Sequence, residues 1–219
     1  MRVAEKFEKS HLSSPEVAPL IENAKFYYTE GYFLTHGVES ILELSSKSTA
    51  AGKVISFSIT MESETNIINQ TFAMNFSAPF IPQFFTKQLQ EILPHTDIII
   101  GNESEAEAWA SATGLPDAKD LPAIARSIAL LPKSNPSRPR IVIFTQGAQQ
   151  TVLVTSDKPD SPKTFPVDIL ADSQIVDTNG AGDAFAGGFL GALVAGKSLD
   201  ESILAGHALA RACVQQVST

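Results

Sequence analysis

The sequence has few of the features that tie a protein to an oxidising compartment, a nucleic acid or a membrane. Its 219 residues include one cysteine, Cys213, so no disulfide can form within the chain and a reducing compartment is expected. There are 16 basic residues against 24 acidic ones, a net charge of −8, and no basic run. Nucleic acid is therefore not an expected partner, because binding its phosphate backbone requires a basic surface.

Long apolar runs are also absent. None approaches the length that crosses a bilayer, and the first residues, Met-Arg-Val-Ala-Glu, do not begin a secretory signal. We therefore expect no membrane partner and a cytoplasmic location, with the nucleus as a second compartment. The hydrophobic content of 43% is enough for one sizeable core, so a single domain over residues 1–219 and a monomer are expected.

Apolar segments of strand length alternate with amphipathic segments of helical length. The pattern predicts strands over 25–29, 54–60, 72–76, 97–100 and 141–144, antiparallel edge strands over 151–155 and 164–169, and helices over 14–24, 38–50, 83–93, 106–113, 121–131 and 199–216. A further strand-like segment ends near Val176. Residues 133–140 are predicted to be a linker whose basic side chains face water. Such alternation predicts an α/β fold with a mainly parallel sheet between two helical layers.

One heptapeptide, Asp-Thr-Asn-Gly-Ala-Gly-Asp at residues 177–183, stands out from this pattern. A turn of small residues that opens a helix leaves backbone N–H groups without partners, and the helix dipole adds to their attraction for anions. Gly180, Ala181 and Gly182 are thus predicted to form an anion hole for phosphate. Asp183 is either a residue that favours a helix start or a base placed beside that anion.

These residues, with Ala184 and Phe185, resemble the C-terminal signature of the ribokinase-like (PfkB) family of sugar and nucleoside kinases. Further matching stretches occur in the family's order and cover nearly the whole chain: Asn-Phe-Ser-Ala-Pro-Phe at 75–80, Asn-Glu-Ser-Glu at 102–105, Ile-Val-Ile-Phe-Thr-Gln-Gly at 141–147 and Ala-Gly-His at 205–207. Within the family the chain is most similar to the adenosine kinases. The resemblance implies a three-layer ribokinase-like fold, transfer of the ATP γ-phosphoryl group to the 5′-hydroxyl of adenosine, and Mg²⁺ as cofactor.

The resemblance also assigns expected roles to individual residues. Asp183 would be the catalytic base. ATP would be bound by Asn102, Thr145, Gly147, Asn179 and His207, and the acceptor by Tyr32, Asn75, Ser77, Phe80, Asn179 and Asp183. Glu105 and Asn102 would hold Mg²⁺, through water. Ordinary structural roles remain open for several of them: helix capping for Asn102 and Glu105, and core packing for Tyr32, Phe80 and His207.

The sequence departs from the family pattern in two places. A Gly-Gly segment, a ribose-contacting carboxylate and a small β lid, all expected in the N-terminal region, have no counterpart, so we expect a fragment whose own activity is open. Residues 54–70 exceed the family pattern, which predicts an insertion or a translated intron. A related sugar kinase, such as a ribokinase or fructokinase, and a non-catalytic ATP-binding fragment are the alternative functions.

Overall fold

A computed structural model of the chain describes residues 7–50 and 70–216. The described strands are β1 (Phe26–Glu30), β2 (Thr71–Asn75), β3 (Ile98–Asn102), β4 (Ile141–Thr145), β5 (Gln150–Thr155) and β6 (Lys163–Pro166). The α-helices are α1 (Ala18–Asn23), α2 (Val38–Ala50), α3 (Phe80–Phe84), α4 (Thr86–Ile92), α5 (Glu103–Thr113), α6 (Leu121–Ala129), α7 (Ala181–Val194) and α8 (Leu199–Val214). In these ranges no helix has both the length and the apolar character needed to span a membrane.

The six strands form one sheet whose spatial order is the order of the chain, β1 to β6. Strands β1 to β4 run parallel, whereas β5 and β6 are antiparallel additions at one edge. Strands β2, β3 and β4 are almost entirely buried, as is usual for parallel strands covered on both faces, whereas β1 is only half-buried. The prediction of a mainly parallel α/β sheet with antiparallel edge strands is confirmed.

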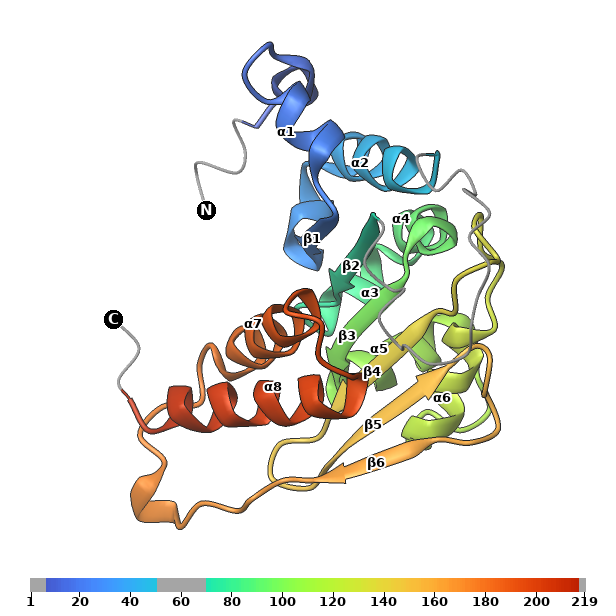
Figure 1. Cartoon of the computed structure of the whole chain (residues 1–219). Helices are drawn as coiled ribbons and strands as arrows, with labels where there is room; N and C mark the ends of the chain where they lie inside the picture. The colour runs from blue at the N-terminus through green and yellow to red at the C-terminus, as the bar shows by residue number, and fades with distance from the viewer. Residues whose placement is uncertain (1–6, 51–69, 217–219) are drawn as a thin grey trace, which may run out of the picture.

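Helices cover the sheet on both faces (Figure 1). One core contains Met74, Phe76, Trp109 and Phe144 and lies between the sheet and the helices of the first part of the chain. A smaller core lies between the opposite face of the sheet and the hairpin of α7 and α8, which brings in Phe185. The chain therefore has the three layers that the sequence predicts.

The α7–α8 hairpin owes its close packing to glycine. A Cβ atom added at Gly188 would lie 2.6 Å from the carbonyl oxygen of Ala205 and 3.0 Å from the Cα of Gly206. A Cβ added at the neighbouring Gly187 would meet no atom of the described chain within 4 Å. Hence one side of α7 needs a glycine for the approach of α8, while the next position has room for a side chain.

We expect Gly188→Ala to destabilise the protein by about 1–3 kcal/mol, because the two helix backbones must move apart. Gly187→Ala is the matched control and should stabilise by about 0.5–1 kcal/mol, since alanine loses less backbone entropy in a helix. Urea unfolding of both variants measures the difference. Equal effects of the two substitutions would contradict the close packing of α7 on α8.

Three predicted elements differ from the structure. The helix predicted over 14–24 begins only at Ala18, because Ser14 caps an isolated turn through its Oγ and the amide of Val17. The helix predicted over 83–93 is two short helices, α3 and α4, which meet at Phe85. The segment ending near Val176 is not a strand: its amide bonds to the carbonyl of Val214 at the end of α8 instead of joining the sheet.

The linker at residues 133–140 is also not solvated as predicted. Arg140 is fully buried, and Lys133 and Arg138 both form ion pairs with the buried carboxylate of Asp97, at 2.5 and 3.2 Å. These cations tie the linker to the start of β3. The predicted strand over 54–60 and the predicted insertion over 54–70 lie outside the described residues, apart from Gln70.

Candidate active site

Each of the four parallel strands ends in a polar residue. Glu30, Asn75, Asn102 and Thr145 are the last residues of β1, β2, β3 and β4, and the register pairs Glu30 with Asn75 and Asn102 with Thr145. Side chains alternate between the faces of a sheet. Apolar residues two or four positions earlier in these strands belong to the core that packs on α7, so the four polar ends lie on the α7 side as well: Phe26, Ala73, Ile98, Ile100, Ile141 and Ile143.

The turn before α7 has its own local hydrogen bonds. The N–H of Asn179 donates to Asp177 Oδ1 at 2.9 Å, and Gly180 has a φ of 75°, a left-handed conformation that favours glycine. The N–H of Ala181 donates to the carbonyl of Thr178 at 3.3 Å. The predicted anion hole is thus corrected at one position: the amides without an acceptor in the described chain are those of Gly180 and Gly182.

The end of α8 holds this turn in place. The carbonyl of Val214 accepts hydrogen bonds from the amides of Val176 and Asp177, at 2.8 and 3.3 Å. The thiol of Cys213 contacts the carbonyl of Asn179 at 3.6 Å and is half-buried. A helix distant in sequence therefore fixes the conformation of the glycine turn.

Asp183 lies in the first turn of α7 and is exposed. Burial raises the pKa of Glu105 to about 7, and the charges of Glu30, Glu103 and Asp183 contribute to this rise, against a hydrogen bond from the Asn102 amide. Burial, followed by the hydrogen bond to Glu30, raises the pKa of Tyr28, and the charge of Asp183 adds the smallest contribution. The start of α7 therefore lies within electrostatic range of the ends of β1 and β3.

A cavity of about 530 Å³ adjoins the glycine turn. Its lining includes Asn102, Thr145, Gly147 and His207, four of the five residues predicted to bind ATP, together with Thr178, Ala181 and Gly182 from the turn. Asn179, the fifth, does not line it. Gly147 has a φ of 52° and open space around its Cα, so its backbone is accessible.

His207 contacts neighbouring side chains of the core and also lines the cavity. Its Nε2 lies 2.8 Å from Thr151 Oγ1, and its ring centroid lies 5.7 Å from that of Phe185. Burial lowers the pKa of His207, and the charge of Asp168 partly opposes this. A neutral imidazole on the wall of the cavity is suited to contact with an uncharged aromatic base.

Asn102 and Glu105 form a reciprocal cap at the start of α5. Glu105 accepts hydrogen bonds from Asn102 N and Asn102 Nδ2, both at 3.0 Å, and its own amide donates to Asn102 Oδ1 at 3.0 Å. The capping interpretation is therefore confirmed. In the described ranges no three His, Cys, Asp or Glu side chains are grouped so that they could hold a metal ion.

The raised pKa of Glu105 gives a prediction about stability. A carboxyl whose pKa is higher in the folded than in the unfolded chain binds its proton more tightly when folded, so stability falls as pH rises from about 4.5 through about 7. Without metal, the wild-type chain should lose on the order of 2–3 kcal/mol relative to Glu105→Gln between pH 4.5 and 8. Urea unfolding in EDTA across this range measures it, with Glu107→Gln on the same helix as the control. Parallel pH profiles for wild type and Glu105→Gln would contradict the assignment.

Four of the six residues predicted to bind the acceptor lie at or just after the ends of β1 and β2: Tyr32, Asn75, Ser77 and Phe80. The rings of Tyr32 and Phe80 lie 5.7 Å apart and are 48% and 37% exposed, so neither is a core ring. Asn75 is buried and accepts a hydrogen bond from the amide of Ser77 at 3.0 Å. Among the predicted acceptor residues, Asn179 and Asp183 come from the glycine turn and the start of α7.

Sequence reasoning missed Glu30 and Tyr28. Glu30 accepts a hydrogen bond from Ser77 Oγ at 2.5 Å and another from the hydroxyl of Tyr28. The signal was present in the sequence: Glu30 precedes Gly31 at the end of a predicted parallel strand, which is the position where α/β proteins place their ligands.

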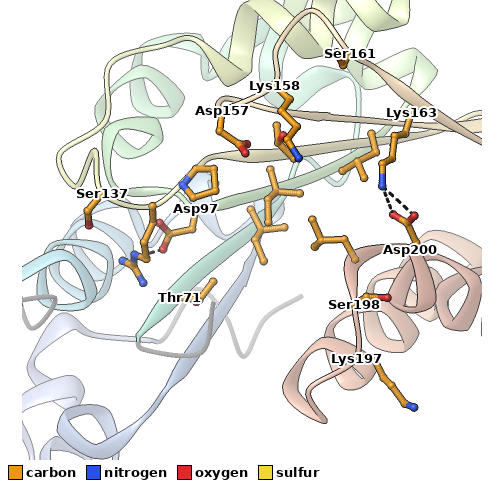
Figure 2. A pocket seen from close by; sticks show the side chains of 17 residues that line it. Thr71, Asp97, Ser137, Asp157, Lys158, Ser161, Lys163, Lys197, Ser198 and Asp200 are labelled. Carbon is orange, nitrogen blue, oxygen red and sulfur yellow. Dashed lines mark hydrogen bonds and ion pairs between the residues drawn. The ribbon is translucent and has the colours of Figure 1, made fainter. Parts of the chain in front are cut away.

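A second cavity, of about 490 Å³, lies at the opposite ends of the strands (Figure 2). Its lining includes Ile98, Ile141 and Leu153 from the sheet. Lys163 and Asp200 also line it and form an ion pair, with 2.8 Å between Lys163 Nζ and Asp200 Oδ1. None of the residues predicted for catalysis or for binding lines this cavity. The candidate active site is therefore at the carboxyl ends of the strands.

Known proteins are similar to this chain over nearly its whole length. The adenosine kinase of Schizophyllum commune is 58% identical over 217 residues, which are 99% of this chain and 58% of that protein. Adenosine kinase 2 of Arabidopsis thaliana is 38% identical over 216 residues, 99% of this chain and 56% of that protein. The chain thus spans a little over half the length of these relatives.

Solved structures of adenosine kinases are also similar to this chain over nearly its whole length. An Anopheles gambiae adenosine kinase in complex with P1,P4-di(adenosine-5) tetraphosphate superposes with a TM-score of 0.86 at 39% identity, covering 97% of this chain and 57% of that one. A Schistosoma mansoni adenosine kinase in complex with 2-fluoroadenosine gives a TM-score of 0.85 at 33% identity over the same shares. The family description "pfkB family carbohydrate kinase" matches residues 2–219, so the chain belongs to the pfkB family of carbohydrate kinases.

Proposed function

We propose that this chain transfers the γ-phosphoryl group of ATP to the 5′-hydroxyl of adenosine, giving ADP and AMP in purine salvage. The observation that carries the proposal is the position of the glycine turn. Thr178, Ala181 and Gly182 of this turn line the 530 Å³ cavity, and Asp183 follows directly in the first turn of α7. Similarity to adenosine kinases over 99% of the chain supports adenosine as the acceptor.

The cavity is the proposed place of ATP. Thr145 supplies a hydroxyl and Gly147 an unobstructed backbone for the phosphates, and His207 lies on the wall where an adenine ring would pack. Asn102 lines the same cavity, next to Thr145 in the register of the sheet. The start of α7 adds the positive end of a helix dipole, which favours phosphate.

Asp183 is the proposed general base. As the 5′-oxygen forms its bond to the γ-phosphorus, the bond from that phosphorus to the bridging oxygen of ADP breaks, and the hydroxyl proton passes to the Asp183 carboxylate. An ordinary carboxylate is a weak base for an alcohol, so its contribution depends on position. The amides of Gly180 and Gly182 stabilise the charge on the transferring group.

Mg²⁺ fits this site in only one manner. Both carboxylate oxygens of Glu105 accept hydrogen bonds from Asn102, so the side chain does not offer a cage of direct ligands. Mg²⁺ commonly keeps several waters and binds through one carboxylate and the phosphates of its nucleotide. Glu105 would hold it through water, and the ion would neutralise charge on the triphosphate.

ADP release by the purified chain tests the proposal, with adenosine, ribose and fructose as separate acceptors, each with and without Mg²⁺. We expect Mg²⁺-dependent turnover with adenosine. Turnover with ribose or fructose alone would make the chain a sugar kinase. Binding of ATP without turnover on any acceptor would make it a non-catalytic nucleotide-binding protein.

A further inference from the structure

The carboxylate of Glu30 joins two segments that are far apart in the sequence. Its Oε2 accepts a hydrogen bond from Ser77 Oγ at 2.5 Å, and its Oε1 accepts one from the hydroxyl of Tyr28. Ser77 Oγ in turn accepts the amide of Gly31 at 2.7 Å. The end of β1 and the loop after β2 are thus linked through one carboxylate and one hydroxyl, 47 residues apart.

Ser77 needs such support, because its backbone is in an unfavourable conformation. Its φ of 69° lies in the left-handed region, which a residue with a side chain seldom adopts without compensation. The compensation comes from two sides: its amide donates to Asn75 Oδ1 at 3.0 Å, and its hydroxyl is fixed between Glu30 and Gly31. A Cβ at Gly31 would lie 2.4 Å from the carbonyl oxygen of Phe76, so the two segments are also in close backbone contact.

Each linked segment carries one of the two exposed aromatic rings. Tyr32 follows Glu30 by two residues, and Phe80 follows Ser77 by three; their centroids lie 5.7 Å apart. We infer that Glu30 is a positioning residue of the acceptor site, which holds the Tyr32 and Phe80 segments together through Ser77 and so sets the aromatic surface that the acceptor base contacts. This inference rests on the proposed function, because it assigns the acceptor to these rings.

Glu30 lies away from the cavity that is the proposed place of ATP. It lies at the end of β1, and it does not line the 530 Å³ cavity. Strand β2, which ends in Asn75, lies between β1 and the cavity-lining end of β3. Loss of the Glu30–Ser77 link should therefore weaken the binding of the acceptor far more than that of the nucleotide.

Calorimetry with adenosine and, separately, with ADP tests the inference on the whole chain. Glu30→Ala and Ser77→Ala are each expected to weaken adenosine binding about 10- to 100-fold, since small displacements of a positioning group have effects of that size. ADP binding should stay within about twofold of wild type. The double variant should be no weaker than the single ones, because both remove the same link.

Two further variants distinguish positioning from general damage. Glu30→Gln keeps an oxygen that can accept the Ser77 hydroxyl and should restore much of the adenosine affinity. The control is Glu39→Gln, because Glu39 is an exposed carboxylate in the first turn of α2. This substitution should change the affinity for neither adenosine nor ADP. Equal weakening of adenosine and ADP by Glu30→Ala, unchanged adenosine binding, or additive effects of the two alanine variants would overturn the inference.

Hydrogen exchange of the chain without ligand tests the Glu30–Ser77 link independently of the proposed function. Glu30→Ala should speed amide exchange at residues 31–35 and 75–80, with β3, β4 and α8 unchanged. Should the wild-type chain bind ADP but not adenosine, the acceptor assignment fails. The link itself then stands if exchange accelerates in those two segments, and it falls if exchange there matches wild type.

Discussion

Replacing Asp183 with asparagine is expected to lower the turnover of adenosine about 10²–10⁴-fold, the range typical for loss of a general base. Asparagine has nearly the same shape but cannot take the proton of the attacking hydroxyl. Nucleotide binding should stay within about twofold, because Asp183 does not line the cavity that adjoins the glycine turn. Steady-state ADP release gives the turnover, and calorimetry with ADP gives the binding.

Asp200→Asn is the matched control for this experiment. Asp200 is also an acidic residue in the first turn of a helix, α8. Either substitution therefore removes one favourable interaction between a carboxylate and a helix dipole. It pairs with exposed Lys163 at the other end of the sheet and should leave turnover nearly unchanged. Near-normal turnover in Asp183→Asn, or equal loss in both variants, would remove Asp183 from the mechanism.

Arg140→Met should have the largest effect on stability, a loss of about 3–5 kcal/mol. The guanidinium of Arg140 is fully buried and donates to backbone carbonyls at the end of α6 and before β3: those of Leu93, Thr96, Ile128, Ala129, Leu131 and Pro132. Burial lowers the pKa of Arg140 to about 10, and the Asp97 carboxylate opposes this, so the group stays charged at neutral pH. Methionine fills similar space but donates no hydrogen bond, so each of these carbonyl oxygens loses the guanidinium. Of the six, those of Leu93 and Ile128 keep a backbone donor, the amides of Thr96 and Leu131.

The control for Arg140 is Arg126→Met. Arg126 forms an ion pair with Asp160 at 2.7 Å on the surface, and both side chains are largely exposed. Such pairs contribute less than about 1 kcal/mol. Urea unfolding of both variants should therefore show a difference of several kcal/mol, and similar small losses would mean that water replaces the guanidinium.

The fold was predictable because its strongest signals are local. The strands at 98–102 and 141–145 begin with continuous apolar runs, Ile98–Ile100 and Ile141–Phe144, and α2 coincides with its predicted range, 38–50. The linker was not predictable in the same manner. Pro, Ser and basic residues at 133–140 indicate a solvated loop by composition, whereas Arg140 is buried because carbonyls from distant segments converge on it. Such long-range compensation leaves no periodic pattern in the sequence.

The candidate site shows the same division. Asn102, Thr145, Gly147 and His207 were named from short motifs, and the structure brings them to one cavity, although their roles remain predictions. Glu30 belongs to no motif that the resemblance supplied. Its partner Ser77 lies 47 residues away, and only the register of β1 against β2 brings the two together.

The agreement between strand order and chain order has a consequence for how this protein acquires its shape. Each of the six described strands can attach to an edge that is already formed, so none of them has to be inserted between two neighbours. Assembly during synthesis could then follow translation from β1 onward, with each new strand covering the open edge left by the one before. The glycine turn and α7 follow the six described strands along the chain, and so the phosphate site would form only after these strands have paired.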